Sequence, residues 1–285
     1  MDDFSADWLD QRESVDRAAR NPRLLRRLSG WRDGRQKLRI IDLGAGTGSN
    51  FRFLAPFLGG QQHWLLVDKD PALLAGISPR LQHWAAASGL DSERKDTDLV
   101  LRGVDASYQV ETRQLDLTVD LARLDLHGVD LVTASALLDL VSADWCAELA
   151  ARCHDTKTTV FITLSYDGAI GWQPPDPDDA RVRRLVNRHQ RTDKGFGPAL
   201  GPQAVAHLSA ALKRLGYRVY RGRSDWQLGL AHIGIRQALA QGYAQAAQAI
   251  EPGTAPWLDA WLARRHETIR MGNLSVGHLD LFGCL

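Results

Sequence analysis

The feature that most constrains the fold of this chain is a short apolar stretch, residues 38–43, that runs directly into a glycine-rich loop. Glycine occupies every second position of this loop, at Gly44, Gly46 and Gly48. Glycine has no Cβ, so such a loop turns tightly and lets its backbone lie flat against a ligand. The dinucleotide-binding fingerprint G-x-G-x-x-G/A places its third small residue five positions after the first. Here the third glycine comes one residue earlier and Ser49 takes that position, so the spacing argues against a dinucleotide.

Three later segments repeat the pattern of an apolar stretch beside a polar residue. Residues 62–67 are predicted to form the next strand, which ends at Asp68, and Asp116 follows another run of alternating apolar residues. Residues 128–135 contain a further apolar stretch. An acid about twenty residues after a glycine loop, at the end of a strand, suits both hydroxyls of a ribose. Together these segments predict strands of a parallel sheet with a ligand at their ends.

Asp42 and the three glycines resemble motif I, D/E-x-G-x-G-x-G, of the class I S-adenosylmethionine-dependent methyltransferases. The resemblance covers residues 38–165 well, and the chain looks like an unassigned bacterial group of such proteins. It implies S-adenosyl-L-methionine as the cofactor, with Asp116 receiving the adenine amino group and residues 128–135 opening toward the methyl donor. The residues that it implies in cofactor binding are Asp42, Gly44, Ala45, Gly46, Gly48, Asn50, Asp68, Lys69, Asp116, Leu117, Ser135 and Ala136.

The resemblance also implies the fold class. It is an α/β protein with a seven-stranded, mostly parallel Rossmann-like methyltransferase sheet, in the order 3-2-1-4-5-7-6, with helices on both faces. The 285 residues are enough for one such domain. We expect residues 1–36 to form an N-terminal helical cap, 37–168 the S-adenosylmethionine-binding core and 169–285 an acceptor-side half. A helical insertion at 230–273 is expected before the last strand.

Local patterns within this outline predict individual elements. Residues 71–76 and 79–88 are predicted to form the helix after the second strand. Residues 99–104 and 108–115 are predicted to pair as a hairpin, and the fifth strand to span 158–165. Residues 168–179 hold three prolines and are predicted to lack a continuous element.

Composition argues against several other classes of protein. The formal net charge of +1 gives no general argument for nucleic acid as a partner. No apolar run approaches the roughly 20 residues that span a bilayer, and Met1–Phe4 lacks the pattern of a signal peptide. We therefore expect a cytoplasmic protein with no membrane partner. Three cysteines are too few for a disulfide framework, and no cluster has metal-ligand spacing, so no metal site is predicted.

The N-terminal segment 5–32 has helical periodicity, interrupted at Asn21 and Pro22, and the region is densely basic. In one interpretation the basic run is a solvated helix face, and in the other it contacts phosphate or RNA. The basic residues of this region are Arg17, Arg20, Arg23, Arg26, Arg27, Arg32, Arg35, Lys37 and Arg39.

The acceptor half of the site lies beyond the carboxyl ends of the strands in open α/β sheets. Asp139 follows the strand that would face the methyl group, so it is predicted to be catalytic; the alternative is a helix-start residue favoured by the helix dipole. Tyr166 and His189 are further catalytic candidates. Segment 189–196 is predicted to be a mobile lid. The predicted substrate-binding residues are Asp139, Tyr166, Asp167, Trp172, His189, Arg191, Lys194 and Phe196.

The acceptor segments lack the motifs typical of nucleobase methylation. No [D/N/S]-P-P-[Y/F/W] motif follows the fourth strand, and no cysteine has the Pro-Cys context of the cytosine C5 enzymes. We therefore expect a methyltransferase that acts on a small, ring-containing molecule such as a pterin or a phenolic metabolite. Two alternatives stay open: an RNA methyltransferase that uses the basic N-terminal arm, and an S-adenosylmethionine-binding protein without catalysis. The sequence is compatible with a homodimer.

Overall fold

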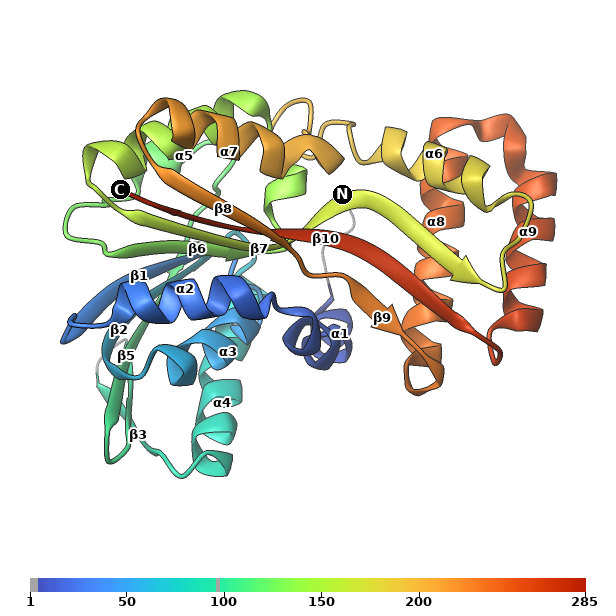
Figure 1. The fold of residues 1–285 in the computed structure, drawn as a ribbon. Helices are drawn as coiled ribbons and strands as arrows, with labels where there is room; N and C mark the ends of the chain where they lie inside the picture. Colours follow the sequence, from blue (N-terminus) through green and yellow to red (C-terminus); the bar gives the residue numbers. More distant parts are fainter. Residues whose placement is uncertain (1–4, 96–97) are drawn as a thin grey trace.

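The described residues form one ten-stranded sheet. The computed structural model describes residues 5–95 and 98–285, so Met1–Phe4, which the signal-peptide argument used, lies outside them. The strand order is β3-β4-β5-β2-β1-β6-β7-β10-β8, and β9 pairs with β10 off this path (Figure 1). The strands are β1 Lys37–Leu43, β2 Gly60–Asp68, β3 Asp91–Lys95, β4 Asp98–Arg102, β5 Ala106–Gln114, β6 Leu131–Ser135, β7 Thr159–Gln173, β8 Arg218–Arg223, β9 Trp226–Leu228 and β10 Asn273–Cys284.

The middle of the sheet confirms the predicted strand order. Strands β5, β2, β1, β6 and β7 run parallel, while β10 is antiparallel to both β7 and β8. These seven strands have the order 3-2-1-4-5-7-6, and the predicted hairpin is β4 with β5. The predicted count of seven is wrong, because β3, β4 and β9 are added. All residues of β3 are exposed, so it lacks the apolar alternation of a strand, and β9 alternates over only three residues, which is too short a signal.

Helices cover both faces of the sheet. Helices α2, α3 and α4 pack in one apolar cluster, and α5 and α7 pack in the other (Figure 1). Asn21, Asp70 and Ser142 accept backbone N–H groups in the first turns of α2, α4 and α5, which satisfies donors that a helix start leaves unpaired. The helices are α1 Ala6–Ala19, α2 Pro22–Arg32, α3 Ser49–Leu58, α4 Pro71–Ala87, α5 Ala143–Asp155, α6 Asp179–His189, α7 Ala204–Arg214, α8 Ile233–Ile250 and α9 Ala255–Thr268.

Helix α4 corrects one prediction. Residues 71–87 form a continuous helix that contains Pro79 and includes residues 77–78, which the prediction left out. Proline removes one helical hydrogen bond, but Leu74, Ile77 and Leu81 on both sides of it are buried in the same apolar cluster. Burial of this continuous face keeps the helix in one piece.

Strand β7 corrects a second prediction. It continues to Gln173 rather than ending at Ser165, so it crosses the expected core boundary at residue 168 and takes in Trp172. Antiparallel pairing with β10 continues along the added part, with a register shift near Val276. Gly168 adopts a φ of 92°, a conformation that favours glycine, and lets the chain pass this irregular point.

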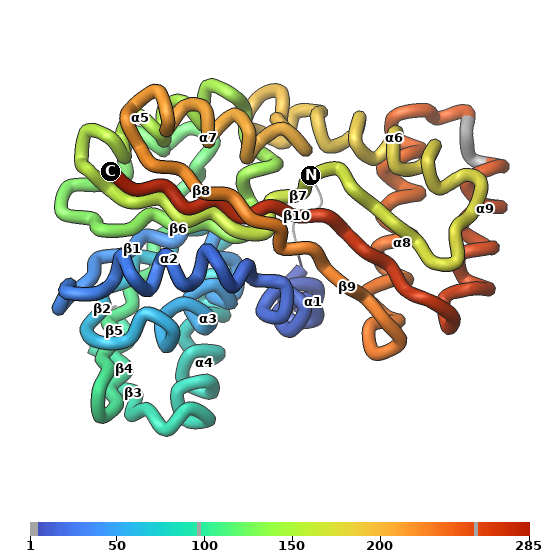
Figure 2. Tube along the Cα trace, viewed as in Figure 1, coloured from blue at the N-terminus to red at the C-terminus, as the bar shows by residue number. Residues whose placement is uncertain are grey.

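Helices α6, α8 and α9 form a separate helical layer, which the long strands β7 and β10 reach from the core (Figure 2). The expected helical insertion before the last strand is α8 and α9. Five short 3-10 turns complete the described elements: Leu121–Arg123, Leu138–Leu140, Gly201–Gln203, Leu230–His232 and Pro252–Thr254. None of the described helices is long and apolar enough to cross a membrane.

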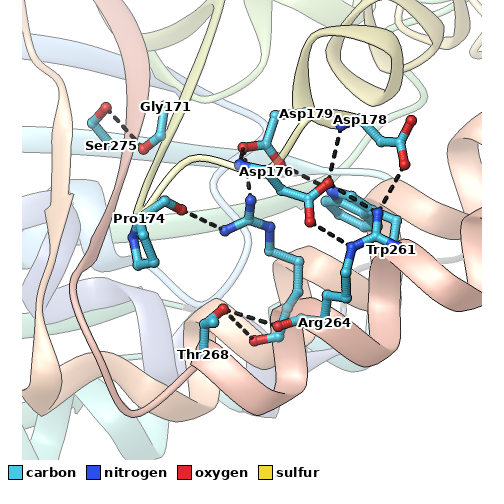
Figure 3. Close-up of polar contacts among 10 residues, drawn as sticks. Gly171, Pro174, Asp176, Asp178, Asp179, Trp261, Arg264, Thr268 and Ser275 are labelled. Atoms are coloured by element: carbon cyan, nitrogen blue, oxygen red, sulfur yellow. Dashed lines mark hydrogen bonds and ion pairs between the residues drawn. The ribbon is translucent and has the colours of Figure 1, made fainter.

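Ion pairs between arginine and aspartate side chains link α9 to the turn before α6 and to the first residue of α6 (Figure 3). Arg264 forms ion pairs with Asp176 and Asp178, at 2.6 and 2.8 Å. Arg265, beside it, pairs with Asp179 at 2.7 Å and donates to the backbone oxygen of Pro174. These contacts join segments some 90 residues apart in the chain and hold the helical layer on the end of β7.

Candidate functional site

A cavity lies at the carboxyl ends of β1, β2, β5 and β6, where the sequence predicts the cofactor. Leu9, Leu137, Leu140 and Phe196 contribute apolar walls. Among the predicted cofactor and acceptor residues, the cavity brings together Gly44, Ala45, Gly46, Asn50, Asp68, Lys69, Asp116, Leu117, Ser135, Ala136, Lys194 and Phe196.

The glycine loop turns where the sequence requires glycine. Gly44, Gly46 and Gly48 have φ values of 66°, 54° and 80°. A Cβ on Gly46 would lie 3.0 Å from Leu9 Cδ1, which is closer than most real contacts. Gly48 does not line the cavity; it is the N-cap residue of α3. The loop therefore leaves its backbone exposed to a ligand at Gly44 and Gly46.

Asp42 of β1 precedes the glycine loop and is hydrogen-bonded to the helix that follows the loop. It is buried and does not line the cavity, and its Oδ1 accepts a hydrogen bond from Asn50 Nδ2 at 2.8 Å. The same Asn50 nitrogen lies 3.2 Å from Thr133 Oγ1, which joins β1, α3 and β6. Burial raises the pKa of the Asp42 carboxyl to about 7, although the hydrogen bond from Asn50 opposes this shift.

Asp68 and Asp116 border the cavity from the ends of β2 and β5. Asp68 Oδ2 accepts the backbone N–H of Gly46 at 2.8 Å, and Oδ1 accepts that of Asp70 at 3.0 Å. Asp116 Oδ1 accepts the backbone N–H of Thr118 at 2.9 Å. A carboxylate oxygen accepts more than one hydrogen bond, so both side chains keep acceptor capacity for a ligand.

Helix α1 forms a wall that the sequence analysis did not assign. Leu9, Arg12 and Asp16 line the cavity. Arg12 Nε lies 2.9 Å from Asp16 Oδ2, Trp226 Nε1 donates to Asp16 Oδ1 at 2.9 Å, and the Arg12 guanidinium lies 5.0 Å from the centroid of the Trp226 ring. The spacing of Leu9, Arg12 and Asp16 along one helical face was the available signal.

Asp139 lies behind the cavity wall rather than on it. The cavity is bordered after β6 by Ser135, Ala136, Leu137 and Leu140. Asp139 is 6% exposed, and burial raises the pKa of its carboxyl to about 6, although hydrogen bonding to its own backbone and to the backbone of Tyr166 opposes this shift. The carboxyl is therefore buried behind the wall.

The structure places the other acceptor candidates on β7 away from the cavity wall. The Tyr166 hydroxyl donates to Asn187 Oδ1 at 2.7 Å, and burial raises the pKa of Tyr166. Asp167 accepts the backbone N–H of Ala169 and lies 3.5 Å from Arg223. Trp172 packs edge-on against Trp261 of α9 in the helical layer.

Segment 189–197 crosses the cavity from α6. Lys194 and Phe196 line the cavity, whereas His189 and the exposed Arg191 do not. Phe196 packs edge-on against Trp145 of α5, with ring centroids 5.8 Å apart. Asp193 Oδ1 accepts the backbone N–H groups of Gly195 and Gly197, so the segment has hydrogen bonds of its own.

Several N-terminal arginines make contacts inside the protein. Arg20 is buried and donates to Thr163 Oγ1, and burial lowers its pKa. Arg17 lies over the ring of Phe53, Arg27 over Tyr220 and Arg35 over Trp31. These contacts favour helix packing as the role of these four side chains.

Within residues 5–95 and 98–285, no group of three or more His, Cys, Asp or Glu side chains is arranged to hold a metal ion.

Solved structures provide the comparison for this architecture, since neither a protein-family model nor a curated protein matches the chain. A candidate methyltransferase from Bacillus halodurans C-125 is similar, with a TM-score of 0.51, 11% identity and coverage of 91% of this chain and 97% of that chain. The chain has the class I methyltransferase fold.

Two further structures have TM-scores of 0.45. A SAM-dependent methyltransferase from Thiobacillus denitrificans, solved in complex with S-adenosyl-L-homocysteine, is 15% identical, over 99% of this chain and all of that chain. The cyclopropane synthase MmaA2 from Mycobacterium tuberculosis is 12% identical, over 99% of this chain and 87% of that chain. At such identities the similarity concerns the fold alone.

Proposed function

We propose that this protein is an S-adenosyl-L-methionine-dependent methyltransferase that acts on a small molecule. One observation carries the proposal: the glycine loop, Asp68 and Asp116 come from three different strand ends and border a single cavity. The carboxylates of Asp68 and Asp116 suit a ribose diol and an exocyclic amine respectively, because both groups donate hydrogen bonds. The early third glycine favours this cofactor over a dinucleotide.

The residues present fit that cofactor. Gly44 and Gly46 border the cavity with left-handed backbone and no Cβ, so a ligand can approach the loop closely. Thr47 Oγ1, on the same wall, is buried without a hydrogen-bond partner. Each Asp68 oxygen accepts one backbone N–H and keeps capacity for a ribose hydroxyl. S-adenosyl-L-methionine supplies an electrophilic methyl group on a sulfonium when bound.

The protein's own contribution is positioning and exclusion of water, which together can lower a barrier by several kcal/mol. Leu137 and Leu140 lie after β6, where the methyl group would face the acceptor, and Phe196 of segment 189–197 lines the same cavity. Helix α1 borders the same cavity through Leu9. Because two separate segments, α1 and 189–197, line this cavity, we favour a small acceptor over a macromolecule.

Calorimetry tests the proposal. S-adenosylhomocysteine, the demethylated product, is expected to bind at a single site, and NAD is expected not to bind. Transfer of a labelled methyl group to a panel of small metabolites then tests catalysis. Absence of S-adenosylhomocysteine binding would contradict the proposal, and binding without transfer to any of a broad panel would favour a donor-binding protein without catalysis.

A further inference from the structure

Lys194 places a positive charge on the wall of the same cavity that Leu140 and Phe196 line. Its ammonium donates to Thr192 Oγ1 at 3.0 Å and lies 3.5 Å from each ring nitrogen of His189. Burial lowers the pKa of the Lys194 ammonium, and both burial and Lys194 lower the pKa of His189. A neutral His189 accepts a hydrogen bond and orients the ammonium.

The charge of Lys194 has no counter-ion in the part of the chain that the structure describes. Its contacts there are a hydroxyl and an imidazole, and no described carboxylate forms an ion pair with it. An ammonium has three donors, so one remains for a ligand. A partly buried cation without a partner is unfavourable, and a bound anion would relieve this cost.

The position of Lys194 points to the acceptor rather than to the donor. The amino-acid part of the donor is expected at the glycine loop, where Leu9 of α1 lies against Gly46. The segment that carries Lys194 meets different neighbours: a Cβ on Gly195 would contact Thr118, and one on Gly197 would contact Ser142. Lys194 thus belongs to the wall formed after β5 and β6.

We propose that Lys194, oriented by His189, binds a carboxylate on the methyl acceptor, so that the acceptor is a small apolar acid. One ammonium matches one negative charge, and the apolar side chains of Leu140 and Phe196 in the same cavity suit an apolar body. This inference rests on the proposed function and names its substrate class.

Benzoate and benzamide test the inference, since they share a ring and differ in charge. Both are titrated into protein saturated with S-adenosylhomocysteine. The parent protein is expected to bind benzoate about 10- to 100-fold more tightly than benzamide, the range for one hydrogen bond to a charged group. Lys194→Met should remove this preference without changing benzamide affinity, and Lys194→Arg should keep most of it. Lys213→Met, at an exposed lysine of α7, is the control for loss of one positive charge.

Equal affinity for the two probes in the parent protein, or a preference that survives in Lys194→Met, would overturn the inference. A second comparison separates the donor from the acceptor. If Lys194→Met weakens binding of S-adenosylhomocysteine but not of 5′-methylthioadenosine, which lacks the amino-acid part, the ammonium serves the donor carboxylate. That result overturns this inference and leaves the proposed function intact, whereas failure of the parent to bind S-adenosylhomocysteine contradicts the proposed function itself.

Discussion

At the scale of single residues, Asp68 organises the cavity before any ligand binds. Its two oxygens hold the backbone N–H groups of Gly46 and Asp70, so one carboxylate fixes both the glycine loop and the start of α4. A ribose would therefore meet a side chain whose orientation is already set. Such preorganisation lowers the entropic cost of binding.

Replacing Asp68 with alanine is expected to weaken S-adenosylhomocysteine binding by roughly 1–3 kcal/mol, because ribose hydroxyls and loop N–H groups lose their acceptor. Calorimetry on the purified variant measures this loss. Asp91→Ala, at an exposed position of β3, is the control. Unchanged affinity in Asp68→Ala would remove this residue from the site.

The raised pKa of Asp139 predicts how the free energy of unfolding depends on pH. Burial raises its pKa from 3.8 in the unfolded chain to about 6, so between these pH values the native state binds more protons than the unfolded state. The free energy of unfolding therefore falls as pH rises through this window, by up to about 3 kcal/mol for a shift of roughly two pH units. Asp139→Asn does not titrate, so its stability relative to the parent should rise from pH 4 to pH 7. Urea unfolding at several pH values measures the difference, with Asp91→Asn as the control.

The same variant addresses the catalytic role that the position of Asp139 in the sequence suggests. A general base contributes about 10²- to 10⁴-fold to a rate, so single-turnover methyl transfer would fall by that factor in Asp139→Asn. The carboxyl is instead buried and does not line the cavity, so we expect a small change in rate. A loss of a hundredfold would restore Asp139 as the proton acceptor.

Sequence alone predicted the cavity residues whose positions depend on local backbone. The glycine loop, Asp68 and Asp116 each lie at the end of a strand or just after it, so strand order brings them together. Arg12 and Asp16 were missed because they reach the cavity only through the packing of α1 against β9. The orientation of the Asp139 side chain, behind the cavity wall, is likewise set by tertiary contacts.

At the scale of elements, the predictions failed where long-range pairing overrides a local signal. Pro79 lies within α4, and β7 continues through Gly168, because burial and pairing with β10 stabilise the continuous elements. The helical insertion was predictable from its periodicity, but its attachment was not. That attachment depends on Arg264 and Arg265, whose carboxylate partners lie some 90 residues away.

The two arginines of α9 form a matched pair for a test of this attachment. The Arg265 side chain is 3% exposed and that of Arg264 is 41% exposed. Arg265→Met should destabilise the protein by about 3 kcal/mol, because it leaves Asp179 partly buried without its ion-pair partner. Arg264→Met should cost clearly less, since solvent screens its pairs. Urea unfolding compares the two, and equal losses would show that burial does not decide the contribution.

At the scale of the whole molecule, the cavity joins segments that are distant in the chain. Helix α1 lies on one wall, and Lys194 and Phe196 lie on another, nearly 180 residues later. The sheet holds the strand ends between them, while α8 and α9 lie in the helical layer (Figure 2). A ligand in this cavity therefore contacts both terminal halves of the protein at once.

Hydrogen exchange should report this coupling. If residues 6–19 and 193–197 open only after ligand release, S-adenosylhomocysteine at 100 times its dissociation constant should slow exchange in both segments about 100-fold. Residues 233–250 of α8 do not line the cavity and should change little, and NAD should protect neither segment. Protection of the glycine loop without protection of α1 would show that the N-terminal helix opens independently of the ligand. Protection of both walls would show that α1 and segment 193–197 close on the ligand together, because both line the cavity.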